Sequence, residues 1–181
     1  VDDPAALAAR LRDPAALREV GAEPIQEALE RLGQPSTCAT RALASEDWHH
    51  QLIGAAMAAY AGFDDLAAAC LRCVSEGSEV APELAVIAAH LAPEQTRHAA
   101  STFLAEVSWQ NPELPEAELD EARIRAILSA RSVLPRVGSP MEELDVDAVP
   151  EFVENPDLRE IPDRLDAYWE AWRGGLESES T

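Results

Sequence analysis

Residues 45–107 constrain the fold more than any other part of the chain, because their pattern is that of four successive helices with few residues between them. The stretch is rich in alanine, which favours helix and lets neighbouring helix axes approach closely. Links this short force successive helices to pack roughly antiparallel. The stretch therefore predicts a dense, all-α body with little room for a large ligand cavity.

Capping residues, glycines and prolines set the expected boundaries of these four helices. Gly62 and Gly77 are expected to end the first two, because glycine adopts the left-handed conformation of a helix end without strain. Pro93 suits the first turn of the fourth helix, where its missing N–H costs nothing. We expect helices from Ser45 to Ala61, from Asp64 or Asp65 to Gly77, from Val80 to Leu91, and from Pro93 to Val107.

The net charge of −20 argues against nucleic acids and anionic membranes as partners. All fourteen basic residues are arginines, and they are outnumbered by thirty-four acids, whereas binding to nucleic acids or anionic membranes needs clustered basic residues. Two explanations stay open: an acidic, GC-rich or halophilic proteome, or an acidic surface that docks a basic partner or imitates nucleic acid. No stretch is as long as a membrane span and no signal peptide is visible, so we expect a cytoplasmic protein.

Shorter helices are expected before this stretch. The sequence Asp-Pro-Ala-Ala-Leu occurs at 3–7 and again at 13–17, and each copy is a capping Asp followed by Pro at the first helical position. A third helix is expected over 24–33. A fourth short helix, capped by Ser36 or Thr37, is expected just before the central stretch.

The C-terminal part differs in composition. Residues 112–181 hold eighteen acids and seven arginines. A corner at 111–115 precedes the longest expected helix, over 115–134, which is followed by an extended acidic arm over 135–156 and a last helix over 162–173. We therefore divide the chain into a helical domain, 1–135, and an arm with a C-terminal aromatic helix, 136–181, that packs on the same domain.

Three cysteines are too few for a disulfide scaffold of this size, so reduced thiols are expected. Cys70 and Cys73 form a CxxC pair inside a helix, where buried cysteine behaves as a small hydrophobic residue. The alternative is a zinc site, or less favourably an iron site, in which His49 joins the two thiols. Antiparallel packing would bring His49 or His50 into range, and Cys38 could approach as well.

Aromatic residues in the C-terminal part are the candidate contacts for a protein partner. Tyr168, Trp169 and Trp172 share one face of the last helix. Such a row either docks its helix on the body or leaves an aromatic patch of the kind that anchors interfaces. Phe152, within the acidic arm, is a further candidate contact.

The serial short helices between Trp48 and Leu91 resemble HEAT-type helical-hairpin repeats, although no repeat consensus recurs at a fixed period. We expect a compact bundle or a short HEAT-like array of antiparallel helices. No nucleophile motif or glycine-rich phosphate loop supports an enzyme. The expected function is a non-catalytic protein-interaction module, an adaptor or inhibitor without a cofactor. A small metal or redox protein using Cys70, Cys73 and a nearby His is the alternative.

Overall fold

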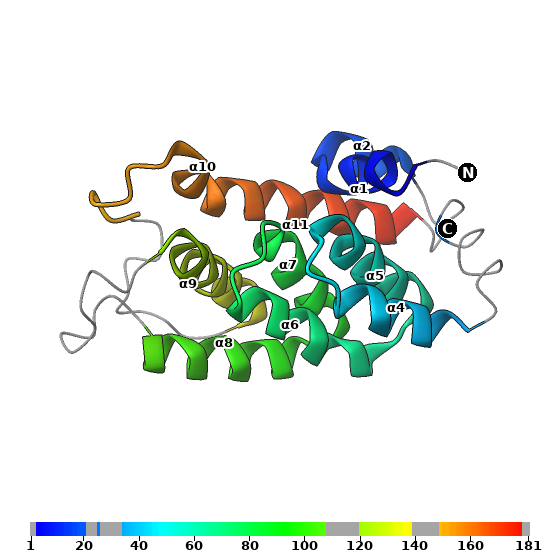
Figure 1. The fold of residues 1–181 in the computed structure, drawn as a ribbon, viewed down its shortest axis with the longest axis horizontal. Helices are drawn as coiled ribbons and strands as arrows, with labels where there is room; N and C mark the ends of the chain where they lie inside the picture. Colours follow the sequence, from blue (N-terminus) through cyan, green and yellow to red (C-terminus); the bar gives the residue numbers. More distant parts are fainter. Residues whose placement is uncertain (1–2, 21–24, 26–33, 108–119, 139–148, 179–181) are drawn as a thin grey trace.

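The computed structural model describes residues 3–20, 25, 34–107, 120–138 and 149–178, and all the regular structure in these ranges is helical (Figure 1). The predicted all-α bundle is therefore confirmed. None of the helices in these ranges has both the length and the apolar character needed to cross a membrane. The α-helices are α1 (Pro4–Arg12), α2 (Pro14–Val20), α4 (Pro35–Leu43), α5 (Trp48–Ala61), α6 (Ala67–Ser75), α7 (Ala81–Leu91), α8 (Pro93–Val107), α9 (Glu121–Val133), α10 (Pro156–Arg159) and α11 (Ile161–Ser178). Short 3-10 helices are η1 (Asp64–Leu66) and η3 (Leu134–Val137).

The four predicted central helices correspond to α5, η1 with α6, α7 and α8. Helix α8 has the expected bounds. Helix α5 begins at Trp48 rather than Ser45, because Asp47 is the capping residue and its Oδ1 accepts a 2.9 Å hydrogen bond from the His49 backbone N–H. Gly62 ends α5 with a φ of 70°, in the left-handed conformation expected of it.

Helix α7 lies in the middle of the bundle (Figure 1). It contacts α5, α6, α8, α9 and α11. All of its residues from Ala81 to Ala89 are buried, so it has no solvent-facing stripe over most of its length. A helix that is covered on all sides is the organising element of the core.

Small residues let helices approach closely, as expected. Where α4 packs on α5, a Cβ added at Gly54 would lie 2.8 Å from Ala42 Cβ. The turn after α6 approaches α9 more closely still, since a Cβ added at Gly77 would lie 2.1 Å from the Ala122 carbonyl oxygen. Gly77 also has a φ of 76°, so both its conformation and its surroundings require glycine.

Replacing Gly77 with alanine should destabilise the protein far more than the same change at Gly62. Both glycines have a positive φ, but nothing lies within 4 Å of a Cβ added at Gly62. Gly62→Ala should therefore cost only the backbone strain, about 1 kcal/mol. Gly77→Ala should cost about 2 kcal/mol more because α9 must move. Urea unfolding measures both, and equal costs would contradict the close approach to Ala122.

Several predicted boundaries were wrong, and at the starts of α4 and α9 the reason is that a different residue occupies the cap position. Helix α4 begins at Pro35 with Gln34 as the cap position, so neither Ser36 nor Thr37 caps it. Helix α9 begins at Glu121, not near 115, because Asp120 Oδ1 accepts a 2.8 Å hydrogen bond from the Arg123 backbone N–H. Helix α11 was expected to end before two glycines, yet it continues through them to Ser178.

Four predictions lie wholly or partly outside the described residues: the helix over 24–33 (apart from Ile25, which is helical and buried), the corner at 111–115, the first residues, 115–119, of the helix expected over 115–134, and 139–148 of the acidic arm. The described end of the arm packs on the bundle. Val153 is buried there in a small second core, which also contains Ile124, Leu128, Leu158 and Ile161.

Helix α11 crosses the bundle in contact with α2, α7 and α9 (Figure 1). Its strongest polar link is to α7, where the fully buried Glu83 carboxylate accepts from Arg164 Nε at 2.8 Å and from Arg164 Nη2 at 2.9 Å. Arg12 of α1 places its Nε 3.8 Å from the same carboxylate and its guanidinium over the Trp48 ring. One buried charge thus ties together residues from distant parts of the sequence.

Removing Arg164 should destabilise the protein strongly, because a buried carboxylate then loses its bidentate partner. Arg164→Met should cost about 3 kcal/mol, and the double variant with Glu83→Gln should recover part of that loss. The matched control is Asp166→Asn, which breaks the exposed Arg136–Asp166 pair and should cost less than about 1 kcal/mol. Denaturant unfolding measures all three, and similar losses for Arg164→Met and Asp166→Asn would contradict this role.

Candidate functional site

An open, largely apolar groove of about 390 Å³ lies between α6, α8 and α9, with Ala85 of α7 contributing to its lining. Sequence reasoning missed it, because we expected alanine-rich helices to leave little room. The apolar side chains of its walls come from all three helices: Ala68, Leu71, Val74, Ala99, Ala100, Phe103, Ala130 and Val133.

The groove exists because small side chains face one another where three helices meet. Ala68, Ala99 and Ala130 do not reach across the space between their helices. Helix α8 itself is held by a narrow stripe, since only Thr96, Ala100 and Leu104 are buried along it. The sequence signal was present in the apolar residues of α8 beside that stripe, Ala99 and Phe103, which are only partly covered.

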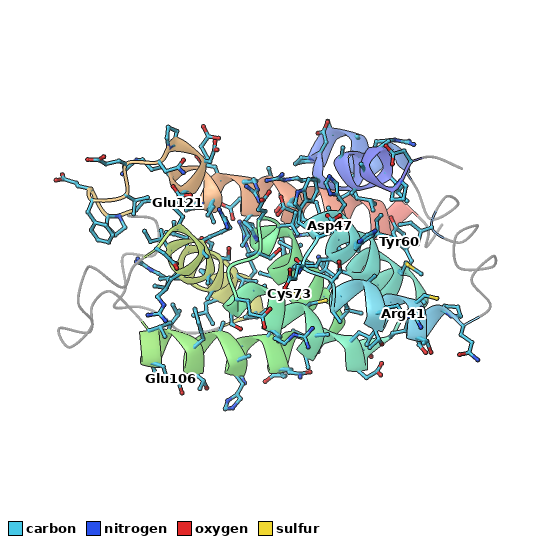
Figure 2. All side chains as sticks on the ribbon, viewed as in Figure 1. Arg41, Asp47, Tyr60, Cys73, Glu106 and Glu121 are labelled. Atoms are coloured by element: carbon cyan, nitrogen blue, oxygen red, sulfur yellow. The ribbon has the colours of Figure 1, made fainter. Side chains whose placement is uncertain are left out.

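Polar side chains stand at the edges of the groove. His98 and Glu106 line it from α8, where they are eight positions apart, about 12 Å along the helix axis. Figure 2 shows Glu106 near the end of α8. Arg72 lines it from α6, with its Nε 3.9 Å from Glu76 and its Nη2 donating to the Leu43 carbonyl at 3.3 Å. An apolar interior with a polar rim is the usual anatomy of a binding surface.

The aromatic row of α11 is used mainly to dock that helix. Tyr168 and Trp172 are buried in the main core, so they present almost no surface to a partner. Trp169 is half-buried, and its ring stacks on His90 of α7 at a centroid distance of 4.6 Å. Phe152 differs from the row, because 47% of it is exposed. Phe152 is therefore the one of these four candidates that still offers a broad contact surface.

Burial lowers the pKa of His90 to about 4, and its Nε2 atom has no hydrogen-bond partner within the described residues. As the pH falls, His90 of the unfolded chain becomes protonated near pH 6.5, whereas His90 of the folded protein stays neutral until about pH 4. The neutral imidazole therefore contributes stability that is complete above about pH 6.5 and is lost as the pH falls towards 4.

Replacing His90 with phenylalanine should flatten the pH dependence of stability between about pH 7 and about pH 5. The substitution keeps an aromatic ring against Trp169 and removes the titrating group. In the wild-type protein we expect a loss of up to about 2 kcal/mol over the full acid window, allowing for the partial exposure of His90. Urea unfolding at several pH values measures the slope, and an unchanged slope in His90→Phe would count against a buried neutral imidazole.

The structure does not bring His49 together with the two predicted thiol ligands. Cys70 and Cys73 are both buried, and Cys73 Sγ donates to the Leu43 carbonyl at 3.2 Å. His49 stacks on Trp48, and its Nδ1 lies 2.7 Å from Asp47 Oδ1. In the described ranges, no group of three or more His, Cys, Asp or Glu side chains is arranged to hold a metal ion.

Burial raises the pKa of Cys70 to about 12, with the neighbouring Cys73 adding to the shift, and burial also raises the pKa of Cys73. Both groups are thiols at neutral pH, whereas metals and redox reactions require the thiolate. This favours the interpretation of Cys70 and Cys73 as core residues. The zinc alternative stays a prediction, which elemental analysis of the untagged protein would test.

Comparison of this chain with protein-family models, with curated proteins and with solved structures gives no match. The features that bear on function are therefore the groove and the exposed acidic segment around Phe152.

Proposed function

We propose that this protein is a non-catalytic interaction module, of the adaptor or inhibitor type, that binds a basic amphipathic helix of a partner protein. The observation that carries the proposal is the open apolar groove between α6, α8 and α9. Exposed apolar concavities with polar rims are typical of sites that bind other proteins.

The dimensions of the groove suit a short helical segment. Its polar ends on α8, His98 and Glu106, are about 12 Å apart, which is slightly more than two turns of a bound helix. Apolar side chains at positions i, i+4 and i+7 of such a helix can enter together, as in other helix-in-groove complexes. Leu71 and Phe103 are partly exposed along the walls and supply the apolar contacts.

The charge of the protein favours a basic partner. A net charge of −20 repels anionic molecules and accelerates the approach of cationic ones. Glu106 is exposed at the rim, where it can meet a lysine or arginine that flanks the apolar face of the bound helix. The expected affinity therefore falls as the salt concentration rises.

The segment around Phe152 is the second surface in this proposal. Phe152 lies next to Glu151 and close to Glu154, and all three are exposed. The segment is held in place by Arg159, whose Nη1 donates to the carbonyls of Pro150 and Val153. An exposed aromatic side chain on a fixed backbone loses little entropy when it binds.

The proposal is tested by selecting helical peptides from a display library against the folded protein. Selected peptides should carry apolar residues at helical spacing and an excess of arginine and lysine. Ala99→Trp, which fills the groove, should weaken their binding about tenfold or more. Ala105→Trp, a change at an exposed position of α8 that does not line the groove, is the matched control and should leave binding unchanged.

Three results would contradict the proposal: acidic selected peptides, equal binding to the two tryptophan variants, or no selected binders at all. Phe152→Ala tests the second surface separately, because it should weaken only peptides that contact Phe152 and leave binding to the groove unchanged. Deleting 136–181 would be a poor test of the second surface, because the deletion also removes Leu165, Tyr168 and Trp172 from the main core.

A further inference from the structure

A second cavity, of about 330 Å³, is lined by α1, α9, α10, the start of α11 and the turn before α7. Unlike the groove it is polar, and its lining includes seven charged side chains, one amide and a single apolar residue, Leu158. A sphere of this volume is about 9 Å across, so the cavity suits a small molecule rather than a peptide.

Three arginines line the cavity, and the protein fixes each of them in a different way. Arg164 is held by Glu83 and also donates from Nη2 to the Glu79 carbonyl at 2.8 Å. Arg125 donates from Nη1 to the Gly77 carbonyl at 2.7 Å. Arg12 rests on Trp48, and burial, followed by the charge of Arg164, lowers its pKa. These guanidinium groups are therefore positioned before any ligand arrives.

The cavity also holds carboxylates that form no ion pair with these arginines within the described residues, although the charge of Glu79 acts on Arg12. Glu79, Asp157 and Glu160 line it, and within the described residues their carboxylates make no hydrogen bond or ion pair. A fourth carboxylate, Glu121 (labelled in Figure 2), accepts a 3.0 Å hydrogen bond from Asn155 Nδ2. Arg125 shares the cavity with these four acids, but the hydrogen bond that holds its guanidinium goes to the Gly77 carbonyl. Both signs of charge thus remain available to a bound molecule.

We infer that this cavity binds a small zwitterion of the amino-acid class, with its carboxylate on the guanidinium of Arg125 and its ammonium group among Asp157, Glu160 and Glu79. A simple anion would face four carboxylates, and a simple cation would face three guanidinium groups. A ligand with both charges satisfies both sets. Leu158 leaves room for only a small apolar contact, which favours a short side chain. The inference is independent of the function proposed for the groove.

The test uses isothermal titration calorimetry of the full chain with L-alanine, glycine and L-serine. We expect saturable binding below about 10 mM for at least one of them. N-acetyl-L-alanine lacks the ammonium group and L-alanine methyl ester lacks the carboxylate, so each should bind at least about tenfold more weakly than L-alanine. Acetate and methylammonium should not bind measurably.

Two variants assign the site. Arg125→Gln and the double variant Asp157→Asn with Glu160→Gln should each weaken binding about tenfold or more. The matched control, Asp163→Asn with Glu170→Gln, changes two exposed acids of α11 outside the cavity and should bind normally. Since Asp157 and Glu160 are exposed, that double variant keeps the test valid even if Arg125→Gln fails to fold. No binding by any of the three amino acids, tight binding of acetate alone, or unchanged binding by the cavity variants would overturn the inference.

Discussion

The structure depends most on one buried charge, the carboxylate of Glu83 on the central helix α7. A carboxylate removed from water is tolerated only with strong partners, and here Arg164 supplies a bidentate pair while Arg12 lies close by. Meeting this requirement fixes α11 and α1 against α7. The same arginines line the polar cavity, so the constraint that orders the fold also positions the positive charges of that cavity.

Alanine has opposite effects in different parts of the bundle. Where two helices meet face to face, as α4 and α5 do at Gly54, small side chains bring the backbones together and leave no space. Where α6, α8 and α9 meet around α7, the same small side chains are too short to fill the space between three axes. Close packing and an open groove therefore arise from one composition.

The two cavities differ in chemistry as much as in place. The groove is apolar and suits the hydrophobic face of a helix, whereas the polar cavity offers fixed charges of both signs. Neither use follows from the helical fold, because a fold of this class serves many functions and only its sites discriminate among them. The aromatic side chains of the C-terminal part also differ in their use. Tyr168 and Trp172 are buried in the core, whereas Phe152, which lies outside their row, is exposed.

The sequence alone determined the all-α class and those helix boundaries that are set by local signals such as Pro93 and Gly62, since such signals act within one turn of the chain. Only the tertiary structure decided which faces are covered. Glu83 has the sequence pattern of an ordinary first-turn acid, yet its partner Arg164 lies eighty-one residues away. The burial of Tyr168, the separation of His49 from the thiols and the opening beside Phe103 likewise depend on which helices become neighbours. Local sequence patterns do not predict those long-range contacts, because helix periodicity identifies an apolar face without specifying what packs against it.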